Sequence, residues 1–497
     1  MYYQSTRNKN YRVKPSETII CGLSEDGGLF VPETIPLLEK SEVKNLCPMD
    51  YCQRTNYILR KFLTDFSEEE IADCTQKAYK GHFDKDIPAP ITKLGENTYI
   101  LELWHGPTCA FKDMALQILP HFLVTAERKA NKKQKIVILT ATSGDTGKAA
   151  LDGFHDVEGT KIMVFYPENG VSKIQKLQMQ TQEGSNVSVF GIRGNFDDTQ
   201  TAVKNIFTNE TICKQLEERG FRFSSANSIN VGRLVPQIAY YISAYADLLA
   251  GGEIEDNEAI NIAVPTGNFG NILAAYYAGR MGIPIKKLIC ASNANCVLTD
   301  FFKTGIYDRR REFYMTESPS MDILISSNLE RLLFELSDKN DDLIREWMDS
   351  LQKKGTYQVT PKIKEKMDDL FYAGCCTDEK EKQMVYRLYH EYSYLCDPHT
   401  AVAMKVYDDY RKTTGDTTKT IVASTASPYK FPSTVLKAIG GFIKEDEFAA
   451  AEALERCSKF PMPQSLQDLR KKEIRFFGSY AKEEMEELVK KIFGGEC

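Results

Sequence analysis

The chain has 497 residues, of which 42% are hydrophobic and 11% aromatic, enough apolar material for two or three domains. Acidic and basic side chains are interspersed and leave a formal net charge of −6 at pH 7. This balance argues against a nucleic acid or an anionic membrane surface as the main partner.

Predicted strands and helices alternate over most of the chain. Residues 1–90 mix short strands and helices, and from about residue 100 the strand candidates are 136–140, 161–166, 187–191, 261–264, 287–291 and 420–424. Helical patterns lie between most of these strands, including 149–155, 173–181 and 198–207. This order predicts an α/β protein with a largely parallel sheet that helices cover on both faces.

The second half of the chain contains one clear helix and one break in the alternation. An apolar stripe from Leu234 to Leu249, followed by Gly251-Gly252, predicts a core helix with a glycine stop. From about 296 to 415, charged amphipathic helices replace the strand–helix rhythm and indicate a helical insertion. The last fifty residues are helix-like and predict a tail on the core.

Lys112 follows a Gly-Pro turn and begins an apolar-periodic segment. The N–H groups at a helix start carry partial positive charge and favour the neutral amine over the ammonium. A neutral, partly desolvated lysine can attack an aldehyde and hold it as a Schiff base. The alternative is a solvated lysine beside a turn.

The loop Thr142-Ser-Gly-Asp-Thr-Gly147 lies between a predicted strand and a predicted helix. Small hydroxyl residues and glycines at such a turn leave backbone N–H groups free to hold an anion. A nucleotide-binding P-loop is excluded, because Thr142 replaces its first glycine and Ala149 its Ser/Thr. An ordinary helix cap by Ser143 or Asp145 is the alternative.

A second loop, Pro265-Thr-Gly-Asn-Phe-Gly-Asn271, joins another predicted strand and helix. Gly267 and Gly270 permit tight turning, and the helix start adds its dipole. This pattern predicts a phosphate cradle made from backbone N–H groups and the Asn268 and Asn271 amides. The spacing does not match the dinucleotide fingerprint, and a plain strand–helix turn stays open as the alternative.

Two weaker signals follow. The turn Ser424-Thr-Ala-Ser-Pro428 ends a predicted parallel strand, where a hydroxyl could bond a ring nitrogen or simply cap the next helix. Asn227-Ser-Ile-Asn230 and Arg233 suit an anionic substrate, although a surface arginine is an equal alternative.

The 13 cysteines are scattered without a repeated C-x-x-C, and only six histidines are present. We therefore predict reduced, buried thiols, including the adjacent pair Cys375-Cys376, and no metal site. The N-terminus lacks a signal-peptide pattern and no run reaches membrane-spanning length, so we expect a cytoplasmic protein.

In this order the motifs resemble the threonine synthase family. Its members are pyridoxal 5′-phosphate (PLP) enzymes of fold type II, which are similar to the tryptophan synthase β-chain. The resemblance rests on Phe111-Lys112-Asp113 and the loops at 142–147, 268–271 and 424–428. Further matches at 22–32, 318–323 and 397–400 extend it over about residues 15–435.

The resemblance implies a two-lobed fold of largely parallel sheets flanked by helices. It implies a small N-terminal α+β domain at 1–90 and a catalytic region at 91–445. The lobes of that region would be about 91–225 and 226–445, with the helical insertion inside the second. Residues 446–497 would form a C-terminal helical tail.

The resemblance also implies roles for single residues. Lys112 would carry the coenzyme and move protons, and Asp145 would lie beside the coenzyme, although many relatives have asparagine there. Thr425 would face the pyridine nitrogen. The coenzyme phosphate would be lined by Gly267, Asn268, Phe269, Gly270 and Asn271. The substrate would be held by Ser143, Gly144, Thr146, Asn230 and Arg233.

The implied reaction converts O-phospho-L-homoserine and water into L-threonine and phosphate, by γ-elimination and addition of water at Cβ. A phospho-lyase that releases 2-oxobutyrate and a catalytically silent PLP-binding relative are the alternatives. The chain departs from the common family motif at Ser427, which replaces a histidine, and at Tyr429, which replaces an alanine. We expect a monomer or a homodimer acting on a small molecule.

Overall fold

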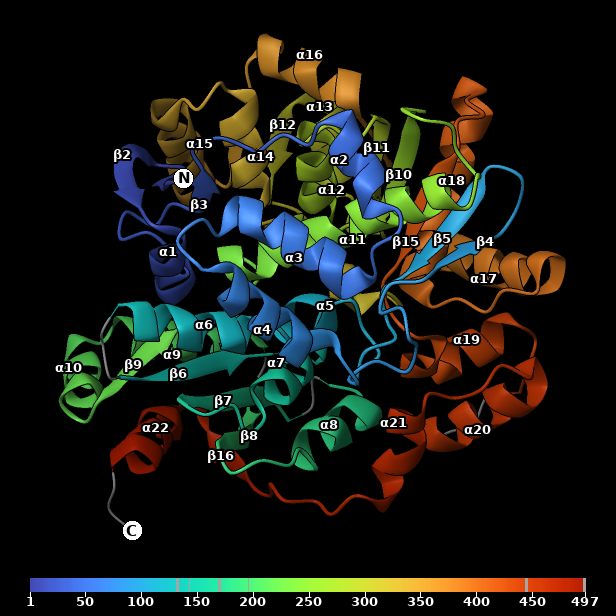
Figure 1. Cartoon of the computed structure of the whole chain (residues 1–497). Coiled ribbons are helices and arrows are strands. Elements are labelled where there is room, and N and C mark those ends of the chain that lie inside the picture. The colour runs from blue at the N-terminus through green and yellow to red at the C-terminus, as the bar shows by residue number, and fades with distance from the viewer. Residues whose placement is uncertain (131–133, 143, 169–170, 195, 443–445, 495–497) are drawn as a thin grey trace.

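A computed structural model describes residues 1–130, 134–142, 144–168, 171–194, 196–442 and 446–494 (Figure 1). Helix α11 (Val231–Ala250) runs through the middle of the molecule, between a five-stranded and a six-stranded sheet. Nearly every residue of α11 is buried, rather than one stripe, because elements pack around its whole circumference. The predicted α/β fold with two largely parallel sheets is confirmed.

The five-stranded sheet is parallel throughout, in the order β16-β8-β7-β6-β9. Its strands are β6 (Lys135–Ala141), β7 (Thr160–Pro167), β8 (Val187–Arg193), β9 (Phe221–Ser224) and β16 (Ser479–Ala481). Alternate residues of β6 enter different cores: Ile136 and Ile138 join the main cluster, while Val137 and Leu139 join a second one. This period of two is what burial on both faces produces.

The six-stranded sheet has the order β14-β11-β10-β15-β5-β4 and is parallel except at the β4–β5 edge. Its strands are β4 (Ile91–Lys93), β5 (Thr98–Glu102), β10 (Ile260–Pro265), β11 (Ile285–Ser292), β14 (Phe371–Cys375) and β15 (Thr420–Ser424). Along β11, Leu288 and Cys290 enter the main cluster, whereas Ile289 and Ala291 enter a separate one. This sheet too is buried on both faces.

The sheets cross the expected domain division in three places. Strands β4 and β5, expected in the first lobe, belong to the sheet of the second. The segment 296–415, expected to be helical, supplies β14 to that sheet and also the antiparallel pair β12 (Ile306–Asp308) and β13 (Thr356–Gln358). The C-terminal segment is not only helical either, because β16 extends the first sheet beside β8.

Helices cover both sheets. Those from the first half of the catalytic region are α5 (Asp113–Leu116), α6 (Leu119–Lys129), α7 (Asp145–Phe154), α8 (Lys173–Gln180), α9 (Phe196–Thr208) and α10 (Glu210–Glu218). Those from the second half are α12 (Gly270–Arg280), α13 (Val297–Thr304), α14 (Leu329–Leu336), α15 (Asp341–Lys354), α16 (Pro361–Leu370), α17 (Asp378–Tyr392), α18 (Pro398–Thr414) and α19 (Pro432–Ala438). The C-terminal segment adds α20 (Glu447–Ser458), α21 (Gln464–Gln467) and α22 (Met485–Gly494).

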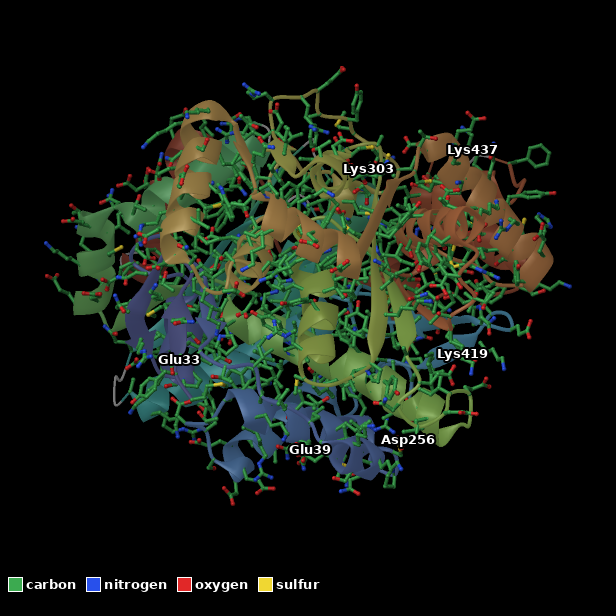
Figure 2. All side chains as sticks on the ribbon, turned by 90° about the horizontal axis from the view of Figure 1, so that it is seen from above. Glu33, Glu39, Asp256, Lys303, Lys419 and Lys437 are labelled. Carbon is green, nitrogen blue, oxygen red and sulfur yellow. The ribbon has the colours of Figure 1, made fainter. Side chains whose placement is uncertain are left out.

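No helix within the described residues is both long and apolar enough to cross a membrane. Acidic and basic side chains both appear in the view of Figure 2, among them Glu33, Glu39, Asp256, Lys303 and Lys419.

The N-terminal segment shares the main hydrophobic core with α11. It consists of β1 (Tyr3–Ser5), β2 (Asn8–Val13), α1 (Pro15–Cys21), β3 (Phe30–Pro32), α2 (Lys40–Leu46), α3 (Tyr51–Phe62) and α4 (Glu68–Tyr79). Buried Arg54 of α3 ties it to α11, because Arg54 Nη1 donates to Ser243 Oγ at 2.9 Å and Asp247 Oδ1 at 2.5 Å. The same guanidinium donates to the Leu46 and Cys47 carbonyls.

We expect Arg54→Leu to lower the free energy of unfolding by about 3–5 kcal/mol, since it leaves a carboxylate and several carbonyls unpaired. Arg60 of the same helix forms an exposed ion pair with Glu68. The control Arg60→Leu should therefore cost less than about 1 kcal/mol. Urea denaturation measures both, and equal losses would contradict the role of Arg54.

Candidate active site

Lys112 occupies the N-cap position of α5, directly after a closed loop. The loop is held by Asp113, whose carboxylate accepts from the Thr108 N–H at 2.8 Å and the Thr108 hydroxyl at 2.6 Å. Gly106 is required there, because a Cβ would lie 2.6 Å from Asp113. The predicted place of Lys112 at a helix start is confirmed.

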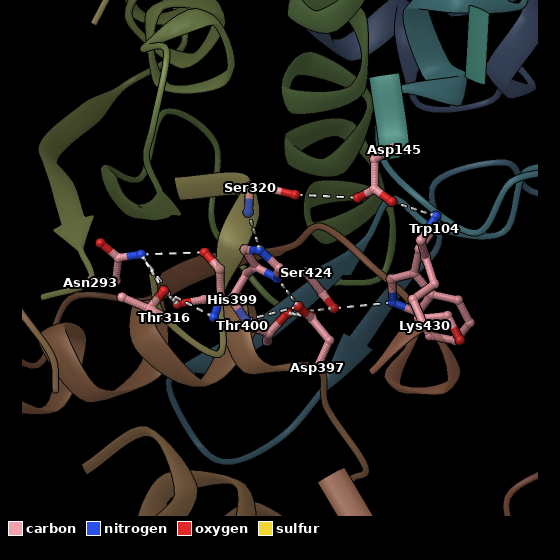
Figure 3. A network of polar contacts seen from close by, with 12 residues as sticks. Trp104, Asp145, Asn293, Thr316, Ser320, Asp397, His399, Thr400, Ser424 and Lys430 are labelled. Carbon is pink, nitrogen blue, oxygen red and sulfur yellow. Dashed lines mark hydrogen bonds and ion pairs between the residues drawn. The ribbon is translucent and has the colours of Figure 1, made fainter. Parts of the chain in front are cut away.

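Two lysines meet at one carboxylate, Asp145, the first residue of α7 (Figure 3). Lys112 Nζ lies 3.5 Å from Asp145 Oδ2, and the Lys112 side chain is 12% exposed. Lys430 Nζ lies 2.7 Å from Asp145 Oδ1, and this lysine is completely buried. Lys430 also donates to the Thr108 carbonyl, so its ammonium is held on two sides.

The amine of Lys112 is easier to deprotonate than an ordinary lysine. Burial lowers its pKa, Asp145 raises it, and the positive charges of Lys430 and Arg233 lower it, with a net decrease. Burial raises the pKa of Asp145, but Lys430 and Lys112 outweigh this and hold it well below its ordinary value. The direction for Lys112 agrees with the sequence-based prediction, but burial and neighbouring cations cause it.

The loop after β6 closes on itself more than expected. The Thr142 hydroxyl accepts from the Gly144 N–H at 3.0 Å and from the Gly147 N–H at 2.9 Å, so these two donors are not free for an anion. Gly144 has φ 145° and no room for a Cβ beside Gln175. Thr146 is half-buried at the second position of α7. Ser143, expected to bind substrate, lies outside the described residues.

The loop after β10 forms a cradle at the start of α12. Its N-cap, Phe269, has the left-handed φ of 65° and is held there by packing against Phe302 and Phe371. A Cβ on Gly267 would lie 3.0 Å from the Ser320 carbonyl. The start of α12 presents N–H groups without intrahelical acceptors, as every helix start does.

Asn271 and Arg233 present buried donors. Asn271 Oδ1 accepts from the hydroxyls of Tyr240 and Tyr241, while its Nδ2 is buried without a hydrogen-bond partner among the described residues. Arg233 Nη1 donates to the Ala226 carbonyl, but Arg233 Nε is likewise buried and unpartnered in the described part of the chain. Burial lowers the pKa of Arg233 to about 10. An anion would supply a hydrogen-bond acceptor for both of these buried donors.

Two other sequence-predicted residues have different outcomes. Asn230 caps α11: its Oδ1 accepts from the Gly232 N–H, and its Nδ2 donates to the Ile19 and Ser225 carbonyls. Its amide is therefore already engaged, and substrate binding by Asn230 stays a prediction. Asn268 is exposed, and its carbonyl accepts from Asn328.

Ser320 connects the lysine site to the cradle. Ser320 Oγ donates to Asp145 Oδ2 at 3.2 Å, and the Ser320 carbonyl packs against Gly267. The Ser320 N–H donates to His399 Nε2 at 3.1 Å. Since Nε2 is an acceptor, the His399 proton sits on Nδ1 and is donated to Asp397 Oδ1 at 2.9 Å. Lys112, Asp145 and the cradle thus share one site, and Figure 3 shows Asp145, Ser320 and His399 within it.

Thr425 lies beside Lys112 because two loops pair. The Thr425 carbonyl accepts from the Phe111 N–H at 2.9 Å, next to a bridge between Ala110 and Ala426. The preceding Ser424 receives the Trp104 indole N–H at 3.1 Å and contacts Thr400. This places Thr425 at the carboxyl end of β15, where parallel sheets bind ligands.

Sequence reasoning missed Lys430 and gave no role to Ser320 or His399. In the sequence, Lys430 stands out because it is a charged residue inside the otherwise uncharged run Pro428–Pro432. Ser320 and His399 lie in motifs that were matched to the family without a function. Lys148, which follows the 142–147 loop, pairs with Asp152 and Gln182.

Three family descriptions match the sequence in chain order. "Threonine synthase N terminus" covers residues 2–79, "Pyridoxal-phosphate dependent enzyme" covers 86–425, and "Threonine synthase, C-terminal" covers 400–492.

Relatives and solved structures agree with these matches. Threonine synthase-like 1 of Homo sapiens is 42% identical, and the match covers 85% of this chain but only 58% of that protein. Threonine synthase of Pseudomonas aeruginosa is 36% identical over 88% of this chain and 90% of its own. The structure of PLP-bound threonine synthase from Brucella melitensis is similar with a TM-score of 0.88, at 34% identity and 99% coverage of both chains.

PLP is the cofactor of this family, and the site fits it. The unpartnered Asn271 Nδ2 and the start of α12 suit a phosphate, and the partly exposed amine of Lys112 suits an aldehyde. By family match, overall structure and site, the chain belongs to the threonine synthase family of PLP-dependent enzymes.

Proposed function

We propose that this chain is a threonine synthase, which converts O-phospho-L-homoserine and water into L-threonine and phosphate. One observation carries the proposal: Lys112 and Lys430 both contact the carboxylate of Asp145 beside a helix-start cradle, and the positive charge of Arg233 acts on Lys112. This excess of positive charge suits a coenzyme and a substrate that both carry phosphate.

The bound coenzyme supplies an electron sink that stabilises negative charge at the substrate carbons. In our proposal the cradle from Gly267 to Asn271 would hold the coenzyme phosphate, and Lys112 would hold its aldehyde. Thr425 would offer its hydroxyl to the ring nitrogen. The ion pair with Lys430 keeps Asp145 charged. The charged carboxylate in turn fixes the position of the Lys112 amine.

Lys112 Nζ would take a proton from the substrate and return it at a neighbouring carbon. Its lowered pKa makes the neutral, proton-accepting form easier to reach than in an ordinary lysine. Arg233 Nε binds the substrate phosphate, while Gly144 and Thr146 lie beside the substrate carboxylate. Burial of the site limits the access of bulk water during these transfers.

A phospho-lyase that releases 2-oxobutyrate is the second candidate. One observation favours it: the 42% identical human relative carries the name threonine synthase-like 1 rather than threonine synthase. Both reactions would use the same coenzyme residues, so the products have to distinguish them.

The purified enzyme with PLP and O-phospho-L-homoserine should release phosphate and L-threonine in equal amounts, measured by phosphate assay and chromatography. Loss of a charge-assisted contact in Arg233→Gln should lower kcat/KM about 100-fold. The exposed Arg280→Gln serves as the control and should stay within about twofold. Phosphate with 2-oxobutyrate would establish the second candidate, and no phosphate would contradict both.

Borohydride reduction of the PLP-loaded enzyme should fix the coenzyme on Lys112, detected by peptide mapping. Of the two lysines that contact Asp145, Lys112 is partly exposed, whereas Lys430 is buried between two acceptors. Lys112→Ala should lose both the label and the visible absorbance band. Lys430→Met should keep the label on Lys112, and a label on Lys430 in the unmodified enzyme would contradict this assignment.

A further inference from the structure

Cys296 and Cys375 form a thiol pair at the carboxyl edge of the six-stranded sheet. Cys375 ends β14 and is aligned with Ser292, the last residue of β11. From Ser292 the chain turns and reaches Cys296, the N-cap of α13. The largest influence on the pKa of each of these two thiols is the other thiol, so the two side chains are neighbours at this edge.

Neither thiol of this pair is buried, contrary to the prediction made for the cysteines in general. Cys375 is exposed and Cys296 is half-buried, whereas the adjacent Cys376 is buried. Both thiols are free in the structure. A solvent-accessible pair of reduced thiols in contact is the arrangement in which a disulfide forms most readily.

The surroundings favour the thiolate of Cys375. The neighbouring Cys296 thiol lowers the pKa of Cys375, and burial raises it. The ammonium groups of Lys303 and Lys380 lower it against the opposing charge of Asp300, and the resulting pKa is about 7. Figure 2 labels Lys303, which belongs to the same helix as Cys296, in the view from above. A thiolate, rather than a thiol, is the species that peroxides oxidise.

We propose that Cys296 and Cys375 are an oxidative modification site, at which a peroxide converts the two thiols into a reversible disulfide. The Cys375 thiolate attacks one oxygen of hydrogen peroxide, so an S–O bond forms, the O–O bond breaks and hydroxide leaves. The Cys296 sulfur then attacks the Cys375 sulfur. An S–S bond forms, the S–O bond on Cys375 breaks, and that oxygen leaves as water with the Cys296 thiol proton. In sum, two thiols and one peroxide give one disulfide and two waters.

The turn from Ser292 to Cys296 connects this thiol pair to the active site. The Cys296 thiol donates to the Asn293 carbonyl at 3.4 Å, a bond that a disulfide removes. Asn293 Nδ2 donates to Asp322 Oδ1 at 2.7 Å, and Asn295 Nδ2 to the same atom at 3.0 Å. Asp322 in turn accepts from the Thr316 N–H.

These bonds anchor the segment 314–322, which carries the Ser320 that bonds to Asp145. Oxidation of Cys296 therefore loosens the support of a residue in the active site. We expect the amides of this segment to exchange hydrogen severalfold faster after oxidation.

Full-length protein is treated with one equivalent of hydrogen peroxide, blocked with N-ethylmaleimide, digested, and analysed by mass spectrometry. A peptide joining Cys296 to Cys375, two hydrogens lighter and released by dithiothreitol, is the expected result. Fragmentation distinguishes Cys375 from Cys376.

Variants test the assignment. Cys375→Ser should abolish the link, Cys457→Ser should leave it, and peroxide-treated Cys296→Ser should show no faster exchange in segment 314–322 than the untreated variant. A link through Cys376, terminal oxidation of Cys375 without a link, or unchanged exchange in the oxidised protein would overturn the proposal. The linkage is mapped on the unsubstituted enzyme and requires no turnover, so failure of the proposed function would not affect this result.

Discussion

Asp145 holds three separate parts of the chain around a site with more positive than negative charge. Its carboxylate lies 2.7 Å from Lys430 Nζ and 3.5 Å from Lys112 Nζ, and it accepts from Ser320. An unpaired buried ammonium would cost several kcal/mol, so the buried lysines depend on this carboxylate. Arg233 adds a further positive charge that acts on Lys112, and phosphate groups can balance this excess.

The same charge excess explains why the site favours a reactive amine. Burial and the neighbouring cations lower the pKa of Lys112, while Asp145 keeps the side chain in place. Ser320 couples this centre to the cradle at Gly267 and, through His399, to Asp397. The segment that carries Ser320 is therefore where a change at the protein surface can reach the active site.

The sequence alone was sufficient to predict the strands that are buried on both faces of a sheet. Strand β15 was predicted with its observed bounds, and the other long parallel strands within a few residues, because continuous apolar runs mark them. Strands β14 and β16 were missed, since β14 is a short edge strand with a glycine and β16 has three residues. The pairing of Lys430 with Asp145 could not be predicted, because only the folded chain brings them together.

The titration of the Lys112 amine in coenzyme-free enzyme tests the central claim most directly. Competitive labelling with a radioactive acylating reagent at a series of pH values, followed by peptide mapping, yields its pKa. The account predicts a pKa below the ordinary lysine value of about 10.4, and a still lower one in Asp145→Asn, since Asp145 stabilises the ammonium. An ordinary pKa in the unsubstituted enzyme, or an unchanged or higher one in Asp145→Asn, would contradict it.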